Sequence, residues 1–397
     1  MFIKISLRRN LLHLLYLILW NSSRKVEGIL MGLYLDYNSS LINTLLMFIG
    51  EFLAGLIIYV YQQKFLAQEI PKKKPLLLTI TVRKKKEDEK KKDSIFKQYF
   101  LIFLCAYFDF VEFTLSIKSV SKFIGVSGSL EWRLTGILTI TSSIFLFYVM
   151  KFKIVRHQKV SLVVLIIALG IIIATEFMVQ KVNVYLSYLQ FIFAIFIIFL
   201  IHFFTSLNDI IEKYLFEFDS LNQFKTLMWE GIFGIILTLI YCAYDSPFGY
   251  LGDYYHKLTT LQFSFLIVAL FIYIVLSGGR NAYRVHVNKL YSPIVKTLTD
   301  YFVNPIYILY YKLRKKDFDG TEYFIMNMIC SLIITFFGCV YNEFIILFFC
   351  GLEFDTYEEV SKRASNLERL SNKSINLDDI DIKEEEDRVS QDGYYNQ

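Results

Sequence analysis

Runs of about twenty apolar residues recur along the whole chain, and they constrain its fold more than any other feature. A helix needs about 20 predominantly apolar residues to cross the hydrocarbon core of a bilayer. Apolar residues make up 55% of the chain, above the roughly 45–50% of soluble domains. The alternating pattern of a membrane β-barrel is absent. The sequence therefore predicts an all-α integral membrane protein.

The apolar runs predict nine membrane-spanning helices. They cover residues of about 41–61, 98–117, 130–150, 160–179, 185–207, 225–243, 259–277, 292–311 and 323–350. A tenth, degenerate helix is expected within 8–35, where the apolar run Leu11–Trp20 is short and a polar stretch follows it. The basic residues ahead of this run also resemble the start of a cleaved signal peptide. Both interpretations of the N-terminal segment remain open.

Loop charges indicate how the chain is oriented, because Lys and Arg are enriched in cytosolic loops. Ten helices with a cytosolic N-terminus place three basic segments in the cytosol: the lysine-rich loop 62–97, Lys151–Lys159, and a loop with Arg280 and Arg284. The basic segment Lys312–Lys316 falls on the lumenal side, against this bias. Both termini are predicted to be cytosolic.

The chain is expected to contain an N-terminal segment (1–35), a first repeat (36–180), a second repeat (181–353) and a tail (354–397). The tail is acidic and polar, so we expect it to be disordered. Its Tyr357–Val360 stretch fits a tyrosine-based sorting pattern, which makes cytosolic sorting proteins candidate partners. Together with the solvated lysine-rich loop, the tail also leaves open a different class of function, a non-transporting membrane adaptor.

No motif for catalysis or for a cofactor is found. The five cysteines lie in or beside apolar runs, without the spacing of metal ligands, and are interpreted as buried thiols. Zinc, haem, P-loop and dinucleotide-binding patterns are absent from the sequence. We therefore expect neither an enzyme nor a cofactor or metal, and no nucleic-acid partner.

Ionisable residues interrupt the apolar runs. A charge in the hydrocarbon core costs at least about 2.5 kcal/mol, so such residues are expected to face the interior of the bundle or a wet cavity. The candidates are Glu51, Asp109, Glu112, Glu131, Arg133, His202, Asp209, Glu212, Glu230, Lys296, Asp300 and Glu343, the last within the final predicted helix. Asp109 and Glu112 share one helix face. Lys296 and Asp300 are four residues apart and can pair on one face.

A position at a helix end, near water, is an alternative for four of these acids: Glu131, Asp209, Glu212 and Glu230. Glu230 opens a predicted span, and an acid in the first turn of a helix is favoured by the helix dipole. Apolar sequence flanks Glu51, Arg133 and Lys296. For these three we expect either a cavity or an inter-helix ion pair.

The two halves of the chain share a sequence pattern. Trp132–Thr135 opens one predicted span and Val295–Asp300 opens another, and in each half a cation is followed by a basic loop. An odd number of helices in each half makes the repeats inverted. Inverted repeats with a site near the membrane midplane are a recurrent plan of transporters.

Three segments in order resemble a known family. Thr44–Phe52, which contains Met-Phe-Ile-Gly-Glu, is similar to a second-helix signature of the solute carrier 35 F branch. Glu212–Leu215 with Trp229–Gly234, and then Tyr341–Glu343, resemble two later motifs of that branch. Over about 36–350 the chain thus resembles a nucleotide-sugar-transporter-like part of the drug/metabolite transporter superfamily, the EamA type.

The resemblance implies a bundle of ten helices in two inverted five-helix repeats. It implies an endomembrane location, such as Golgi, lysosome or vacuole, or ER, and transport by alternating access. Candidate substrate-binding residues are Arg133, Lys296, Asp300 and Glu51, and candidate coupling or gating residues are Asp109, Glu112, Glu230 and Glu343.

The leading hypothesis is a secondary-active transporter of a small organic solute, expected to be anionic because Arg133 and Lys296 would supply positive potential. Lys296 stands where the family has Arg, which removes the planar fork that binds phosphate. The alternative substrate is a cationic metabolite or drug, bound at Glu51, Asp109 and Glu112. The expected partners are this solute and the lipid bilayer; a homodimer is a further candidate.

Overall fold

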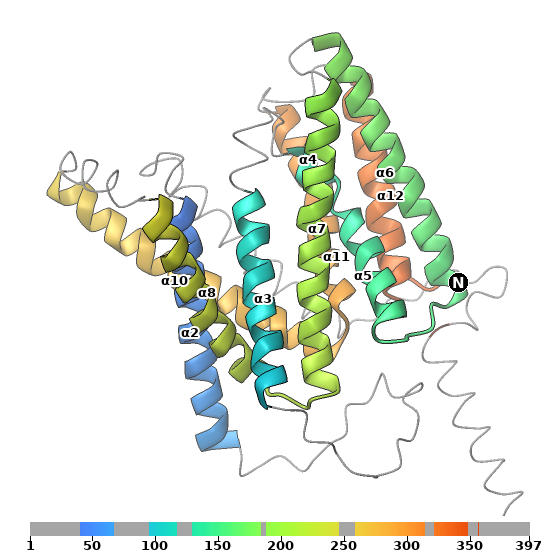
Figure 1. Ribbon diagram of the computed structural model, residues 1–397. Helices are drawn as coiled ribbons and strands as arrows, with labels where there is room; N and C mark the ends of the chain where they lie inside the picture. Colours follow the sequence, from blue (N-terminus) through green and yellow to red (C-terminus); the bar gives the residue numbers. More distant parts are fainter. Residues whose placement is uncertain are drawn as a thin grey trace, which may run out of the picture.

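The computed structural model describes residues 40–66, 95–116, 129–183, 188–245, 259–313, 321–347 and 356. Within these ranges every regular element is helical (Figure 1). The helices are α2 (Ser40–Tyr61) with a terminal π-helical turn η2 (Gln62–Leu66), α3 (Ile95–Leu115), α4 (Ser129–Arg133), α5 (Gly136–Tyr148), α6 (Arg156–Asn183), α7 (Tyr188–Glu217), α8 (Gln223–Asp245), α10 (Thr260–Leu290), α11 (Pro293–Leu313) and α12 (Thr321–Tyr341).

Seven of these helices are long and apolar enough to cross a membrane: α2, α3, α6, α7, α8, α10 and α12. The predicted helical membrane class is therefore confirmed. Large apolar side chains are exposed on the outer faces, for example Val163, Ile166 and Ile167 of α6. The predicted helix within 8–35, most of the loop 62–97 and the tail apart from Thr356 lie outside the described residues.

The predicted span 130–150 is not one continuous helix. α4 ends at Arg133, and α5 begins at Gly136 after a turn at Leu134 and Thr135. The backbone tightens there, because the N–H groups of Ile137 and Leu138 bond the carbonyls three residues earlier, at 2.9 and 3.0 Å. A discontinuity in a membrane helix is tolerated where protein or a cavity surrounds it.

The last predicted helix, 323–350, is also wrong at its end. α12 stops at Tyr341, and Glu343 lies beyond it with a positive φ of 59°. The N–H of Phe344 bonds the carbonyl of Cys339 at 2.9 Å, and the N–H of Glu343 bonds that of Val340 at 3.1 Å. This pair of bonds is a Schellman cap, with Glu343 at the left-handed position that glycine usually occupies.

Glycines hold α2 tightly between α8 and α10. A Cβ on Gly50 would lie 2.6 Å from the carbonyl oxygen of Ile274, and a Cβ on Gly278 would meet the backbone of Gly50. On the other side, a Cβ on Gly231 would lie 2.5 Å from the backbone nitrogen of Phe52. Small residues allow such backbone contact between membrane helices. Glu51 and Glu230, each adjacent to one of these glycines, are thereby fixed in the interior.

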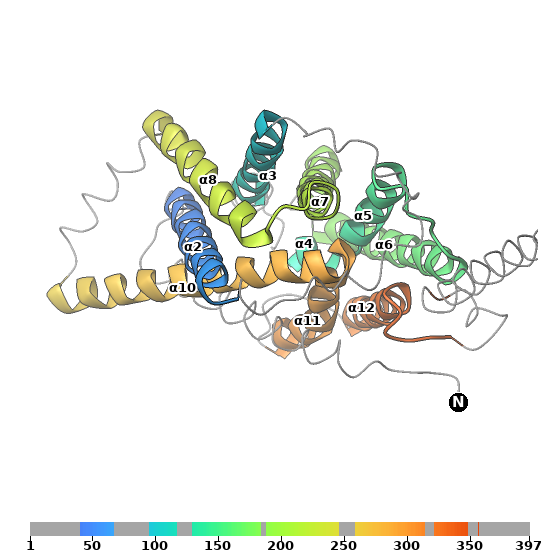
Figure 2. The same ribbon diagram turned by 90° about the horizontal axis from the view of Figure 1, so that it is seen from below.

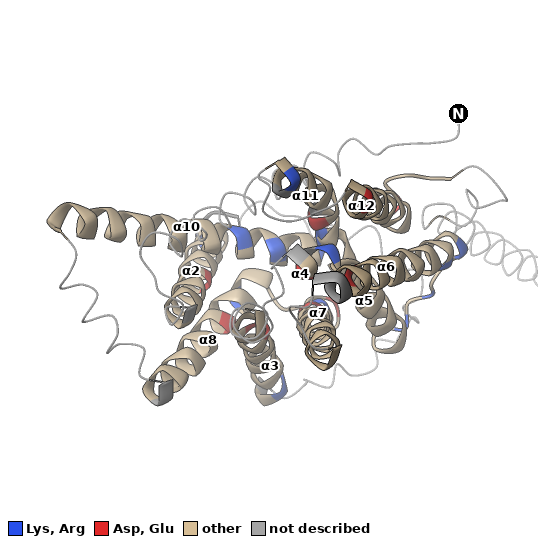
Figure 3. Ribbon diagram, turned by 90° about the horizontal axis from the view of Figure 1, so that it is seen from above, with Lys and Arg blue, Asp and Glu red and all other residues tan. Residues whose placement is uncertain are grey.

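The remaining helices pack around α7, which lies between α3 and α5 (Figures 1 and 2). α6 packs on α12, and α11 packs on both α5 and α12. Acidic and basic segments gather in the middle of the bundle around the C-terminal half of α10 (Figure 3).

Candidate functional site

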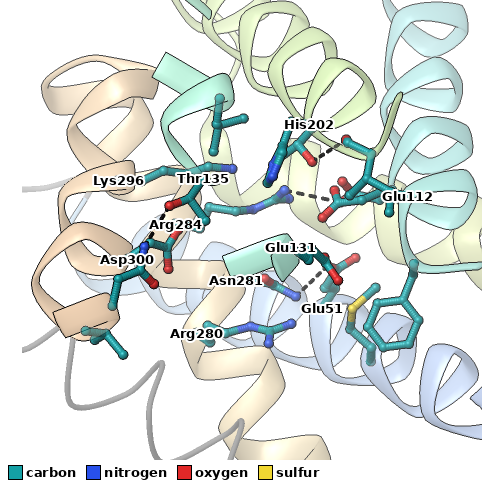
Figure 4. Close-up of a pocket in the computed structure, with 18 residues that line it drawn as sticks. Glu51, Glu112, Glu131, Thr135, His202, Arg280, Asn281, Arg284, Lys296 and Asp300 are labelled. Carbon is teal, nitrogen blue, oxygen red and sulfur yellow. Dashed lines mark hydrogen bonds and ion pairs between the residues drawn. The ribbon is translucent and has the colours of Figure 1, made fainter. Parts of the chain in front are cut away.

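A cavity of about 120 Å³ lies between α2, α3, α4, α5, α7, α10 and α11 (Figure 4). Its lining carboxylates are Glu51, Asp109, Glu112, Glu131 and Asp300, and its lining cationic side chains are Arg280, Arg284 and Lys296. Five of the eight residues predicted for the site thus meet in one cavity: Glu51, Asp109, Glu112, Lys296 and Asp300. Arg133, Glu230 and Glu343 do not line it.

Arg284 of α10 is shared by three carboxylates. Its Nη2 lies 2.8 Å from Glu212 Oε1 and 3.4 Å from Glu230 Oε1, and its Nη1 lies 3.2 Å from Asp109 Oδ2. Asn208 donates to Asp109 and, at 3.5 Å, to Glu230. One guanidinium therefore ties α3, α7 and α8 to α10.

Glu51 of α2 points into the cavity and is fully buried. Its Oε1 accepts a hydrogen bond of 2.6 Å from Asn281 Nδ2, and the two side chains face each other in Figure 4. Its Oε2 has no hydrogen-bond partner among the described residues. A buried carboxylate oxygen without a donor is costly, and this one belongs to a side chain that lines the cavity.

Lys296 of α11 forms an inter-helix ion pair with Asp209 of α7. Its Nζ lies 2.6 Å from Asp209 Oδ2 and 2.7 Å from Oδ1. The spacing of Lys296 and Asp300 allows a pair within α11, and the structure adds a contact across to α7, where the fully buried Asp209 carboxylate faces the ammonium.

The C-terminal end of α10 is hydrogen-bonded to α7. Asn288 donates to Glu212 Oε2 and to the backbone carbonyl of Asp209, both at 2.9 Å. The buried Lys213 ammonium donates to three carbonyls at the end of α10, those of Asn288 and Lys289 at 2.9 and 3.1 Å and that of Tyr291 at 3.0 Å. A cation at a helix C-terminus also complements the helix dipole.

Glu230 is not at the start of its helix. α8 begins at Gln223, so Glu230 lies two turns inside it, with 0% exposure. The interfacial interpretation is therefore wrong for this residue, and the Arg284 contact shows the inter-helix pairing instead. The glycine contact between Gly231 and α2 places the carboxylate at this depth.

Arg133 lies outside the cavity. Its Nη1 contacts Glu176 Oε2 at 2.9 Å, the Tyr323 hydroxyl at 2.8 Å and Asn327 Oδ1 at 2.9 Å. The guanidinium, 4% exposed, joins α4 to α6 and α12. Arg133 and Lys296 therefore do not converge on one site.

Glu343 also lies outside the cavity. Its Oε1 is 3.4 Å from Nε2 of the buried His157 at the start of α6. It lines a second, smaller cavity at the far end of α12.

Arg280 and Arg284 are cavity-lining residues whose place the sequence analysis missed. They were assigned to a cytosolic loop because the apolar run stops at Gly278, whereas α10 continues to Leu290. Both are buried. The spacing of four between Arg280, Arg284 and Asn288 puts them on one helix face and was the available signal.

The four described cysteines are buried and free, in agreement with the interpretation as buried thiols. No protein-family model matches the chain, and its comparison with curated proteins gives no significant match.

Proposed function

We propose that the chain is a secondary-active membrane transporter of a small organic solute and that this solute is a cation. The observation that carries the proposal is the excess of carboxylates at the cavity. Five carboxylates and three cationic side chains line it. Three more fully buried carboxylates contact the cationic side chains that line the cavity: Asp209, Glu212 and Glu230. A cavity whose wall carries an excess of one sign of charge favours ligands of the opposite sign.

Cationic side chains of the cavity already contact carboxylates. Arg284 contacts three acids and Lys296 contacts Asp209. An anionic solute would have to displace these acids, which would then be left buried beside it. A cationic solute needs only an acceptor, and Glu51 Oε2 supplies one. This favours the cationic alternative over the anionic substrate that was the leading hypothesis.

The helix packing supports two inverted repeats with the first helix outside the described residues. Under that plan α2, α3, α4–α5 and α6 correspond to α8, α10, α11 and α12. Helix pairs that correspond under this plan are in contact in both halves: α2–α10 corresponds to α8–α3, α2–α3 to α8–α10, and α5–α6 to α11–α12. The pairs α2–α8, α5–α11 and α6–α12 would lie on the pseudo-two-fold axis.

The corresponding helices α4–α5 and α11 are both irregular beside the cavity. α4–α5 is interrupted at Thr135, and α11 contains Pro305. Asn304, just before the proline, donates a 2.9 Å hydrogen bond to the Thr135 hydroxyl. Transporter sites are typically formed by discontinuous helices at the repeat interface. We place the chain in an endomembrane, with the basic connection 149–155 on the cytosolic side.

The test is a thermal-shift measurement on the purified full chain, with tetraethylammonium and 1-methylpyridinium as cationic probes and uridine monophosphate as an anionic probe. A ligand that binds only the folded state stabilises it by RT ln(1 + [L]/Kd), about 2.7 kcal/mol at a hundredfold excess. We expect a shift with a cation that is lost in Glu51→Gln and kept in Glu322→Gln, an exposed acid of α12. A shift with the anion alone, lost in Lys296→Gln, would contradict the cationic assignment.

A further inference from the structure

A second cavity, of about 90 Å³, lies at one end of the bundle. It is formed by the end of α5, the connection 149–155, Lys213 of α7, the α10–α11 junction and the turn after α12. Its wall combines apolar side chains with polar groups such as Ser143, Ser292 and Asn342.

The two cavities follow each other along the same four helices. On α7, the first cavity is lined up to Thr205 and the second by Lys213. On α10, the step runs from Arg284 to Leu290, and α5 shows the same order. α11, which runs the other way, shows the reverse order. At 1.5 Å per residue the separation is about 9 Å on α10 and about 12 Å on α7, whereas on α11 the consecutive residues Val295 and Lys296 line the second and the first cavity.

The layer between the cavities, here called the septum, consists of paired polar side chains. Lys296 pairs with Asp209 at 2.6 Å, and Asn288 bonds Glu212 at 2.9 Å. Thr139 of α5 hydrogen-bonds Thr297 of α11 at 3.1 Å. These six side chains are at most 9% exposed. The septum therefore joins α5, α7, α10 and α11 at one level and separates the cavities.

We propose that the two cavities are opposite vestibules of one solute path and that the septum is its gate on the side of the connection 149–155. The inference rests on the proposed transport function and assigns the second cavity and the gate to it. The described conformation is closed at the septum. Opening separates α7 from α11 at the Lys296–Asp209 pair and joins the two volumes.

A polar septum suits a barrier that must open repeatedly. A buried ion pair adds little net stability, because the loss of hydration offsets the attraction. When the septum opens, water entering from the vestibules hydrates both partners. An apolar barrier of the same size would expose apolar surface to water on opening, at a cost in free energy proportional to the exposed area. Paired polar groups therefore keep the closed and open states close in free energy.

The test measures cysteine accessibility on the full chain in sealed vesicles of known orientation, with a membrane-impermeant trimethylammonium thiosulfonate. Ser292→Cys reports on the second cavity and Thr205→Cys on the first. We expect Ser292→Cys to react from the side of the connection 149–155 and Thr205→Cys to react only from the opposite side. Reactivity is compared with that of the parent chain.

The septum is then opened by Asp209→Asn, which removes the partner of Lys296. Thr205→Cys should gain at least about tenfold in rate from the Ser292 side, a change of about 1.4 kcal/mol in the opening equilibrium. The control is Glu217→Gln, which removes another acid of α7, ion-paired with Lys213 at 2.9 Å but outside the septum. The double variant Asp209→Asn/Lys296→Gln leaves no unpaired charge and keeps the test available if Asp209→Asn does not fold.

Two results would contradict the assignment of the septum as a gate. One is reaction of Thr205→Cys from both sides while the septum is unaltered. The other is a reaction rate of Thr205→Cys from the Ser292 side that is unchanged in both septum variants. The cation proposal fails separately. If no cationic probe shifts the melting temperature but the accessibility pattern appears, the path stands and the solute class is wrong. If a probe binds through Glu51 but the pattern is absent, the septum assignment is wrong and the solute class stands.

Discussion

The hydroxyl of Thr335 on α12 lies 2.7 Å from the backbone carbonyl of Tyr301 on α11 and 2.8 Å from the Ser331 carbonyl of its own helix, so its single proton is divided between two acceptors. The Tyr301 carbonyl has no helical donor, because Pro305, four residues later, carries no N–H. In a bilayer the missing donor is supplied by a neighbouring helix. Thr335 of α12 thus supplies the donor that Pro305 removes from α11. The contact lies at the level where α11 borders the first cavity.

Replacement of Thr335 by Val should lower the stability of the protein. The Tyr301 carbonyl would lose its donor, and a buried unsatisfied polar group costs roughly 1–3 kcal/mol. The measurement is the melting temperature in detergent. The control is Thr175→Val, which removes a bond of 2.6 Å to the Ile171 carbonyl within exposed helix α6. Equal shifts in the two variants would contradict the compensating role.

Adjacent glycines of α10 should respond oppositely to Ala. At Gly278 the new Cβ would collide with the backbone of Gly50, whereas at Gly279 nothing lies within 4 Å. Gly278→Ala should therefore push α2 away from α10 and sharply lower the yield of folded protein. Gly279→Ala should be neutral or stabilising by up to about 1 kcal/mol, because Ala favours the helix. Size-exclusion profiles and melting temperatures separate the two, and similar behaviour would contradict the close α2–α10 crossing.

Arg133→Gln should affect stability and leave solute binding intact. Glu176 would become a buried carboxylate without its cation, and breaking a buried pair on one side costs about 3–5 kcal/mol. The double variant Arg133→Gln/Glu176→Gln should recover most of this loss. Because Arg133 lies outside the first cavity, the affinity for a cationic probe should be unchanged. A selective loss of affinity at normal stability would restore Arg133 to the substrate site.

At position 343, Gly should be more stable than Ala. Both variants lose the contact with His157, but only Ala retains a side chain at a φ of 59°. The left-handed conformation costs a residue with a Cβ roughly 1–2 kcal/mol. At Gly170 of α6, an open helical position, the order should be reversed. If Ala at 343 melts at or above the temperature of Gly, the cap after α12 is not the one described.

Hydropathy predicted the helices well where one whole face meets lipid, and poorly where the inner face is polar. The run that stops at Gly278 belongs to a helix that continues to Leu290, because carboxylates of other helices pair with the Arg284 guanidinium. The sequence carries no record of those partners, which lie at least 54 positions away in the chain. The break at Thr135 was also not visible in the hydropathy pattern.

The acids of the first cavity were predictable because each interrupts an apolar run, as Glu51 does. Their pairing was not, since the partner of a buried charge depends on how helices cross. Lys296 and Asp300 have the spacing of a pair, and nothing in that spacing indicated the contact of the Lys296 ammonium with Asp209 on another helix. Arg133 has the same kind of sequence context as Lys296 but belongs to a separate cluster with Glu176.

The pairing of Lys296 with Asp209 also has an electrical consequence. A single charge that crosses the membrane field is worth about 2.3 kcal/mol per 100 mV. The ammonium and the carboxylate lie 2.6 Å apart and cancel, so any displacement that carries both along the field does no net electrical work. A lone lysine at this depth would make the conformation of the bundle follow the membrane voltage. Paired with Asp209, Lys296 adds no net charge to a displacement that carries both residues together.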